Sequence, residues 1–383
     1  MRFLHVADLH LGKVVNEFPM IRDQEYILEK ICRIVQEKKI DAVLISGDIY
    51  DRSIPPEEAV RVLDRFLSRL SADGVFVLMI SGNHDSDERL NYGSSLFISQ
   101  KVYITSVYEG ELREAVLEDG FGRVHFWMLP FVKASRVGHY HPEVDTSSYD
   151  AAVRAAISCG VIDPKERNVL LSHQFVTGGS KDPETAGSEN TPSEAVGTIE
   201  KVDASAFDLF DYVALGHIHR PQKIGRNEVR YAGSILKYSL SEIDHEKSAV
   251  LVTMEEKGNV QTELIPLLPR REMRHIKGPF SELMKPEFAT DDYMYVTLTD
   301  EDIIPDAIQK IRTYYPHTMK LDYQNSHTRA AMEFSFASED LSVRPEELLR
   351  DFYRKIAGGE PSEEEWAILL RSAGKAGVID ETD

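Results

Sequence analysis

Along the first 250 residues, short apolar runs alternate with segments of helical periodicity. The runs at residues 2–7, 41–45 and 75–80 are apolar and end at polar residues, as buried strands do. Apolar side chains recur at helical spacing over residues 23–37, and the proline pair at 55–56 opens a second helical pattern. Strands that alternate with helices predict an α/β fold in which helices cover a sheet. Further strands are predicted at residues 124–129, 169–171, 212–215 and 229–232.

The pattern changes after residue 250. A more basic, proline-marked junction at residues 266–277 precedes a β-type run at 293–298, a helix-like segment at 303–314 and a second β-type run at 330–336. This β-α-β order predicts a small second domain. The expected division of the chain is 1–268, 269–340 and 341–383.

Two amphipathic helices are predicted in the tail, one over residues 345–356 and one from Ser362. Glu365 lies three residues after Ser362, which is the spacing of a capping box. Their apolar stripes either pack on the domain to which they belong or are offered to a partner. The stripe residues are Leu348, Leu349, Phe352, Ile356, Trp366, Leu369 and Leu370.

Composition and charge narrow the class of protein. The 383 residues are 42% hydrophobic and 28% charged, which is ordinary for a soluble globular protein. No apolar run approaches the ~20 residues that span a bilayer. The first residues contain no recognisable secretory signal. Two cysteines cannot form a disulfide framework, which favours a reducing cytoplasm as the location. The net charge of −20 argues against generic binding of polyanions, because bulk repulsion opposes contacts with phosphates.

Five polar segments stand at or just after the ends of predicted strands. They are Asp8-Leu-His10, Gly47-Asp-Ile-Tyr-Asp51, Gly82-Asn-His-Asp85, His173 and Gly216-His-Ile-His219. Because the carboxyl ends of strands share one edge of a sheet, we expect these segments to converge. Asp and His are ligands for Mn, Fe or Zn, and a carboxylate can bridge two cations in two-metal hydrolysis.

Neighbouring residues have more modest interpretations. The glycines before Asp48, Asn83 and His217 should allow sharp turns and a close approach of the backbone to a charged site. Asp51 and Asp85 are interpreted as supporting or helix-capping residues, not as ligands. His5 and His125 are interpreted as structural, and six more histidines lack a ligand context: His139, His141, His245, His275, His317 and His327.

The five segments resemble the calcineurin-like metallophosphoesterases, whose pattern is D-x-H, G-D-x-x-D, G-N-H-[DE], H and G-H-x-H. Within that family the resemblance is strongest to nuclease subunits of bacterial complexes. It is carried by residues 1–12, 47–52, 172–176, 216–221 and 231–239. The resemblance implies a layered β-sandwich core flanked by helices, a small α+β capping domain and C-terminal helices.

The resemblance also implies roles for individual residues. Two divalent metals, most often Mn²⁺, would be held: the first by Asp8, His10, Asp48 and His219, the second by Asp48, Asn83, His173 and His217. His84 resembles the catalytic histidine of the family, and an imidazole suits general acid work near neutral pH. No position of the pattern departs from the family.

The activity that the resemblance implies is Mn-dependent cleavage of DNA. It would act as a 3′→5′ exonuclease on duplex ends and as an endonuclease on single strands and hairpins, in repair, recombination and replication. A homodimer through helices of the first domain, and an SMC-like ATPase bound by the tail helices, are expected partners. The expected location is the cytoplasm, with the nucleoid.

Two other functions stay open, together with the residues that grip DNA. A metallophosphatase or small-phosphodiester enzyme is disfavoured by Ser53 and Asp85, where phosphoprotein phosphatases prefer Gly and Glu, and by the extra domain. A DNA- and ATPase-anchoring module would not need the complete ligand set. Residues near the motif loops either contact phosphates or are ordinary solvated side chains: Lys13, Arg52, Arg89, Arg220 and Lys237.

Overall fold

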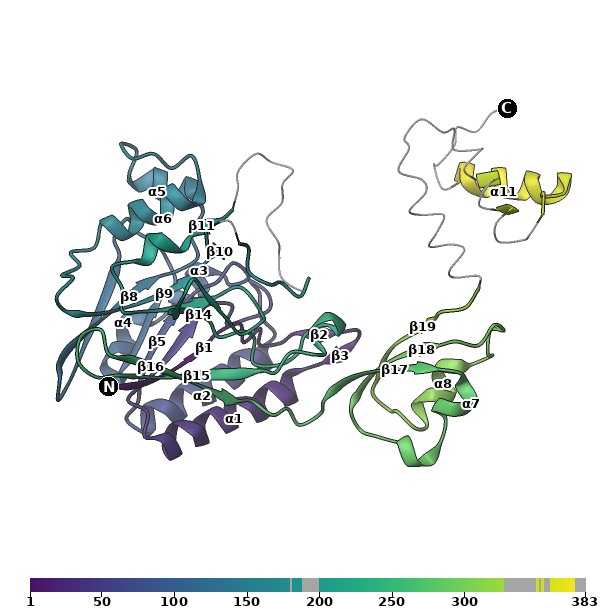
Figure 1. Ribbon diagram of the computed structural model, residues 1–383, viewed down its shortest axis with the longest axis horizontal. Coiled ribbons are helices and arrows are strands. Elements are labelled where there is room, and N and C mark those ends of the chain that lie inside the picture. Colours follow the sequence, from purple (N-terminus) through teal and green to yellow (C-terminus); the bar gives the residue numbers. More distant parts are fainter. Residues whose placement is uncertain (180, 188–199, 327–348, 351–352, 355–358, 376–383) are drawn as a thin grey trace. The chain divides into compact units, whose positions relative to one another are not determined.

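The computed structural model describes residues 1–179, 181–187, 200–326, 349–350, 353–354 and 359–375. The chain divides into two compact units, Met1–Met273 and Arg274–Asp383 (Figure 1). The three-part division at residues 268 and 340 stays a prediction, and the second of these boundaries lies outside the described residues.

The first unit contains two six-stranded sheets. The first sheet has the strand order β16 (Val260–Pro266), β15 (Ser248–Met254), β1 (Arg2–Val6), β4 (Ala42–Ser46), β5 (Phe76–Ile80) and β6 (Val102–Thr105). β1, β4, β5 and β6 are parallel, whereas β15 and β16 are antiparallel to their neighbours. The three N-terminal strands predicted from the sequence are confirmed.

The second sheet has the order β13 (Gln222–Ile224), β14 (Arg226–Tyr231), β12 (Tyr212–Gly216), β9 (Arg167–His173), β8 (Gly122–Leu129) and β7 (Arg113–Asp119). Its four central strands are parallel, and the two edge strands are antiparallel. The four predicted strands of this region are confirmed. The edge strands β7 and β13 were not predicted, because half-exposed edges have weaker apolar runs.

The core lies between the two sheets. Phe3 on β1 packs edge-on against Phe126 on β8 and Tyr212 on β12, with ring centroids 5.6 Å apart in both pairs. The hydroxyl of Ser46 donates to the carbonyl oxygen of Ala214 and so ties the sheets together beside the site. The layered β-sandwich is therefore confirmed.

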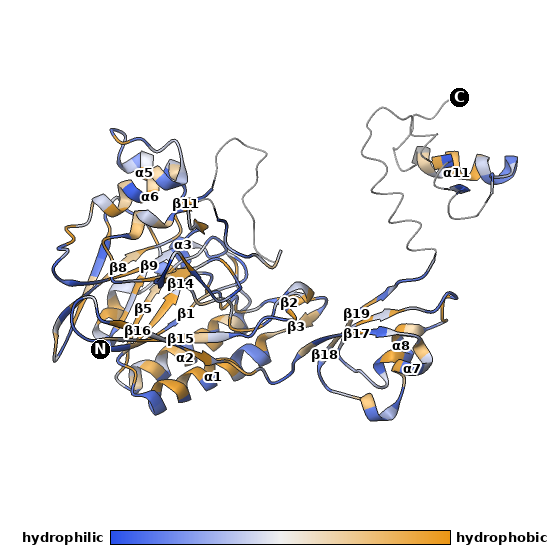
Figure 2. Ribbon diagram, viewed as in Figure 1, coloured by the Kyte–Doolittle hydropathy of each residue, from blue (hydrophilic) through white to orange (hydrophobic). Residues whose placement is uncertain are grey.

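Helices cover the outer faces. α1 (Ile21–Lys38) and α2 (Glu57–Ala72) flank the first sheet, and α5 (Ala134–Tyr140) and α6 (Tyr149–Ser158) flank the second (Figure 1). Each long helix has a buried apolar stripe and a polar outer face, visible as orange and blue in Figure 2. Pro56 is the N-cap of α2, so the proline pair lies just before the helix and not within it. Shorter elements are β2 (Val14–Val15), β3 (Phe18–Pro19), α3 (Asp87–Asn91), α4 (Ser94–Phe97), η1 (Ile98–Gln100), β10 (Val176–Thr177), β11 (Val202–Asp203), η3 (Ala204–Phe207) and η4 (Leu240–Glu242).

The second unit has a three-stranded sheet of β17 (Met273–Gly278), β18 (Tyr293–Leu298) and β19 (Thr318–Tyr323). The helices described between these strands are α7 (Phe280–Leu283), η5 (Pro286–Phe288) and α8 (Ala307–Arg312). β18 confirms the predicted strand, whereas α8 is shorter than predicted because Asp306 has a left-handed backbone at its start. The strand that follows α8 is β19, which was not predicted. The predicted strand at 330–336 lies outside the described residues.

The tail contains α11 (Glu363–Lys375). Its predicted capping box is confirmed: the Glu365 carboxylate accepts the Ser362 N–H at 2.8 Å, and the Ser362 hydroxyl accepts the Glu365 N–H at 3.3 Å. Of the predicted helix at 345–356, only residues 349–350 and 353–354 are described, and they are helical. Across the described part of the chain, no helix has the length and apolarity to cross a bilayer.

Candidate metal centre

The five predicted segments meet where parallel strands of both sheets end. Asp8 and His10 follow β1, Asp48 follows β4, and Asn83 and His84 follow β5. In the other sheet, His173 is the last residue of β9, while His217 and His219 follow β12. The structure therefore brings all eight predicted ligand and catalytic residues together, although the assignment of each role stays a prediction.

Asp48 lies in the middle of the cluster. Its Oδ2 is 3.6 Å from the Nε2 of His10 and 3.5 Å from the Nε2 of His173. On the far side, the Oδ1 of Asn83 is 3.1 Å from the same His173 nitrogen and 3.0 Å from the Nδ1 of His217. One carboxylate oxygen thus faces nitrogen and oxygen atoms on two sides, an arrangement in which Asp48 could be shared by two cations.

The other group contains Asp8, His10 and His219, whose ligand atoms lie within 4.8 Å of one another. The Nε2 atoms of His10 and His219 are only 3.1 Å apart, an approach that needs a proton or a cation between two lone pairs. The Oδ2 of Asp8 is buried and has no hydrogen-bond partner among the described residues. A buried carboxylate oxygen in that state is costly, so this donor set fits a divalent cation.

The backbone of the cluster is strained. Asp8, His10, Asp48 and His217 have φ values of 51°, 44°, 49° and 105°, in the left-handed region that side chains other than glycine avoid. Such strain persists only where the surrounding structure enforces it, and it is concentrated at functional sites.

Glycines allow the segments to approach one another, as predicted. A Cβ at Gly82 would lie 2.1 Å from the Oδ1 of Asp48, and a Cβ at Gly216 would lie 1.8 Å from the carbonyl oxygen of Ser46. Neither position accepts a side chain without movement of the backbone. The predicted close approach before Asn83 and His217 is therefore confirmed.

Burial and neighbouring charges both shift the pKa values of the clustered Asp and His side chains, and for His173 and Asp48 the two effects oppose each other. Burial raises the pKa of Asp8 to about 6 and lowers the pKa of His217 to about 3. Burial alone would lower the pKa of His173, but the neighbouring Asp48 carboxylate raises it to about 9. Burial opposes ionisation of Asp48 as well, yet His173 and His10 hold its pKa well below the usual range. The carboxylate form of Asp48 is therefore the favoured one beside these histidines.

His84 lies at the edge of the cluster, half-buried. Its backbone N–H donates to the Oδ1 of Asp48 at 3.0 Å, and its Nδ1 is 3.0 Å from the carbonyl oxygen of Asp51. Because a carbonyl only accepts, Nδ1 carries a proton, and the ring orientation is fixed. The ring centroid is 4.9 Å from that of His10, so the imidazole is adjacent to the ligands.

Asp85 and Asp51 support the loops. The Asp85 carboxylate accepts the backbone N–H groups of Ile49, Tyr50 and Gly82 at 3.0, 2.9 and 2.8 Å. It thereby joins the loops that follow β4 and β5. Burial, followed by the charge of Asp48, raises the pKa of Asp85 to about 7. Asp51 accepts Lys13 at 2.7 Å and lies 3.6 Å from the Nδ1 of His10. The bonds of Asp85 fit the predicted supporting role, although it joins loops and does not cap a helix. That Asp51 and Asp85 are not ligands stays a prediction.

The sequence interpretation missed several supporting residues. Gln24 on α1 donates to the carbonyl oxygens of Leu9 and His10 at 3.2 and 2.7 Å, and Tyr238 donates to the former at 2.6 Å. Gln24 could have been noticed in the sequence, because it is a polar residue on the apolar face of the predicted helix at residues 23–37. Glu242, the partner of His219, lies in the short turn η4 and had no such signal.

The five basic residues proposed to contact DNA differ in whether their charges are already paired with acidic side chains and in how exposed they are. Lys13 pairs with Asp51, Arg220 with Glu184, and Lys237 with Glu272, so these charges are partly neutralised within the chain. Arg52 is 76% exposed and lies 3.7 Å from Asp51, and Arg89 is exposed on α3. These two arginines are the more accessible candidates.

The other histidines of the described residues lie outside the cluster. His5 is buried between the sheets and contacts the Tyr212 hydroxyl at 2.9 Å, and His125 pairs with Glu114 at 2.5 Å, which fits their structural interpretation. Within the described part of the chain, the groups able to hold a metal include no other histidine outside the site. His327 lies outside the described residues.

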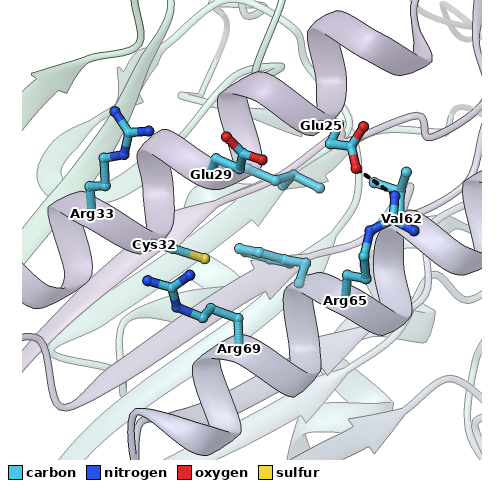
Figure 3. Close-up of a pocket in the computed structure, with 9 residues that line it drawn as sticks. Glu25, Glu29, Cys32, Arg33, Val62, Arg65 and Arg69 are labelled. Atoms are coloured by element: carbon cyan, nitrogen blue, oxygen red, sulfur yellow. Dashed lines mark hydrogen bonds and ion pairs between the residues drawn. The ribbon is translucent and has the colours of Figure 1, made fainter.

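A hollow of about 490 Å³ lies between α1 and α2 (Figure 3). The ion pair between Glu25 and Arg65 crosses one end, and Cys32 and Phe66 form part of the floor. None of the residues that line it belongs to the candidate site.

Comparisons with known proteins agree with this geometry. Residues 1–221 match the family described as Calcineurin-like phosphoesterase, and residues 269–356 match SbcD_C, described as Type 5 capsule protein repressor C-terminal domain. The SbcD subunit of the SbcCD nuclease from Staphylococcus epidermidis is 33% identical over 327 residues, which cover 84% of this chain and 85% of that protein.

Two solved structures show more distant similarity. A dimetal phosphatase from Danio rerio is 12% identical, covers 70% of this chain and 96% of its own, and has a TM-score of 0.38. An archaeal phosphodiesterase is also 12% identical, covers 69% of this chain and 100% of its own, and has a TM-score of 0.31.

The sandwich and its cluster of Asp, Asn and His define a metal-dependent phosphoesterase. The first domain match covers more than half of the chain, and the second is to the SbcD_C domain. The chain belongs to the SbcD family of nuclease subunits, within the calcineurin-like phosphoesterases.

Proposed function

We propose that this chain is a Mn²⁺-dependent DNA nuclease that hydrolyses backbone phosphodiesters, as a 3′→5′ exonuclease on duplex ends and an endonuclease on single strands and hairpins. The observation that carries the proposal is the position of Asp48, whose Oδ2 faces His10 on one side and His173 on the other. Two ligand groups that share one carboxylate suit in-line displacement at phosphorus.

The residues of the cluster have two proposed roles, metal binding and proton donation. When bound, two divalent cations at this site activate a water and neutralise charge on the phosphoryl oxygens. Asp8, His10, Asp48 and His219 would hold one of these cations, and Asp48, Asn83, His173 and His217 would hold the other. His84 acts as the general acid in its doubly protonated form: Nδ1–H stays bound to the carbonyl oxygen of Asp51, and the proton on Nε2 passes to the departing sugar oxygen, which leaves a neutral imidazole.

Partners follow from exposed apolar side chains. Around α3 and α4, Tyr92, Leu96 and Ile98 are 87%, 74% and 49% exposed, and monomeric surfaces rarely gather such residues. We assign this patch to the homodimer. In the tail, Arg350 stacks on the ring of Trp366 while Ile368 is 61% exposed. We assign the exposed side of α11 to an SMC-like ATPase of the SbcC type, the partner implied by the name of the Staphylococcus relative.

The charge of −20 gives the partners a further role. Most of the basic residues near the site already have acidic partners, so this chain alone offers few contacts for DNA phosphates. The grip on DNA therefore comes from the dimer and the ATPase subunit, in reactions of repair, recombination and replication. This division of labour makes the chain the catalytic subunit.

The test is cleavage of linear duplex and hairpin DNA by the purified chain with Mn²⁺. Wild type should degrade both substrates, and His84→Ala should leave them intact. A phosphopeptide and a cyclic nucleotide assayed in parallel test the phosphatase and small-phosphodiester alternatives. Efficient hydrolysis of either, with DNA left intact, would overturn the proposal.

A further inference from the structure

A buried ion pair lies directly behind His219. The Nζ of Lys247 is 2.5 Å from the Oε2 of Glu242, and the two side chains are 3% and 0% exposed. Glu242 ends the turn η4, and Lys247 immediately precedes β15. Neither residue belongs to the sequence motifs of the site.

The pair holds His219 at two points. The Oε1 of Glu242 accepts a hydrogen bond from the ring Nδ1 of His219 at 3.1 Å. The ammonium of Lys247 donates to the carbonyl oxygen of His219 at 2.8 Å and to the Ser234 hydroxyl at 2.7 Å. Ser234 donates its backbone N–H to the same carbonyl oxygen at 3.1 Å. Ring and main chain of one histidine are therefore fixed by one ion pair.

This arrangement fixes the tautomer of His219. Because the Glu242 carboxylate only accepts, the proton of the neutral imidazole is placed on Nδ1, and the lone pair on Nε2. That Nε2 is the atom 3.1 Å from the Nε2 of His10, on the side of Asp8. A carboxylate behind a histidine ligand is the usual device for orienting the ring and raising its basicity toward a metal.

A purely structural role does not explain the pair. Burying two charges costs about as much as their attraction returns, so an apolar pair of similar volume would stabilise the fold at least as well. The contacts of this pair include the ring and the main chain of His219 and the Ser234 segment that holds it. The geometry thus indicates a role in the site.

We propose that Glu242 and Lys247 are positioning residues that orient His219 and set the affinity of the metal position formed by Asp8, His10, Asp48 and His219. The position formed by Asn83, His173 and His217 keeps its affinity without them. This inference rests on the metal ligands of the proposed function, but not on cleavage of DNA.

The experiment is calorimetric titration of the chelator-stripped full-length chain with Mn²⁺. Glu242→Gln keeps the volume of the side chain, and the double variant Glu242→Gln with Lys247→Met removes both charges together. The control is Asp119→Asn, which breaks a comparable ion pair with Arg167, 2.6 Å long, at the opposite end of β9. Thermal melting of each metal-free variant measures any loss of stability separately.

We expect two Mn²⁺ sites in the wild type. In Glu242→Gln and in the double variant, the dissociation constant of one site should rise about 10- to 100-fold while the other is unchanged. Asp119→Asn should melt earlier but bind both ions as the wild type does. ¹⁵N spectra of the metal-free chain should show the His219 proton on Nδ1 in the wild type and a mixture of tautomers in Glu242→Gln.

The outcomes separate the two proposals. A wild-type chain that binds no Mn²⁺ contradicts the metal site itself. Wild-type affinity at both sites in Glu242→Gln, with an unchanged His219 tautomer, overturns the role of the pair and leaves the proposed function standing. Equal weakening of both sites also overturns it, because a general loosening of the fold would act in that way. If the double variant does not fold, the isosteric Glu242→Gln alone decides.

Discussion

Replacing Gly216 by alanine should damage the site through packing alone. The added Cβ would lie 1.8 Å from the carbonyl oxygen of Ser46 and 2.8 Å from the Nδ1 of His173. Real Cβ atoms essentially never approach other heavy atoms closer than 3.0 Å, so the ends of strands β12 and β4 must separate by more than about 1 Å. That movement carries His217 and His219 away from Asp8 and Asp48.

A displacement of about 1 Å at a catalytic site costs on the order of 10²-fold in rate. Gly216→Ala should therefore lower kcat/KM by about 100-fold, which is about 2.7 kcal/mol of transition-state stabilisation. The assay is hydrolysis of bis(p-nitrophenyl) phosphate at saturating Mn²⁺, so that the result does not depend on how DNA is held.

The matched control is Gly120→Ala in the turn between β7 and β8. A Cβ at Gly120 meets nothing within 4 Å, so this variant should retain wild-type activity. Activity of Gly216→Ala within threefold of the wild type would refute the reasoning that close contact between the two sheets positions the ligands.

Three further predictions test separate parts of the structure. His84→Ala should lower DNA cleavage by about 10²- to 10⁴-fold while both Mn²⁺ ions still bind in calorimetry, because the proposed role of His84 is to supply a proton and not to hold a metal. Since His84 lies close enough to His10 and Asp48 to share a metal with them, loss of one ion would instead make it a ligand. Burial lowers the pKa of His5 to about 3. Below about pH 6.5, His5 is therefore protonated in the unfolded chain but stays neutral in the folded chain. This difference makes the stability of the fold decrease as the pH drops from 6.5 toward 3. When the free energy of unfolding is measured with chelator present, it should fall less steeply with decreasing pH in His5→Gln than in the wild type, by up to about 1.4 kcal/mol per pH unit. If the two chains lose stability at the same rate per pH unit, His5 is not the origin of the effect. Leu96→Asp on the exposed α4 patch should convert a dimer to a monomer in light scattering, with Mn²⁺ binding unchanged; a variant that stays dimeric would place the dimer interface elsewhere.

The candidate metal ligands were more predictable from the sequence than the residues that hold these ligands in position. Asp8 and Asp48 follow short apolar strands and His173 is the last residue of one; because the ends of such strands share an edge, their convergence could be predicted from the strands alone. Glu242 and Lys247 could not be found in this way, because their partner His219 is distant in the sequence and the turn between them has no periodicity.

The same contrast holds for the fold. Central strands such as β4 and β9 are buried on both faces and appear as continuous apolar runs. β19 has only two buried residues among six, so its pattern is weaker than that of the strand predicted at 330–336. Charges were the least predictable feature: Lys13, Arg220 and Lys237 are cationic in the sequence, but their partners are set only by the tertiary fold.

The central claim is that Asp48 lies between two metal positions at the strand ends. The most direct test is anomalous diffraction at the manganese edge from crystals of the chain soaked in Mn²⁺. We predict two anomalous peaks, one beside Asp8, His10 and His219 and one beside Asn83, His173 and His217, with Asp48 contacting both. A single peak, or two peaks that do not share Asp48, would contradict the two-metal site.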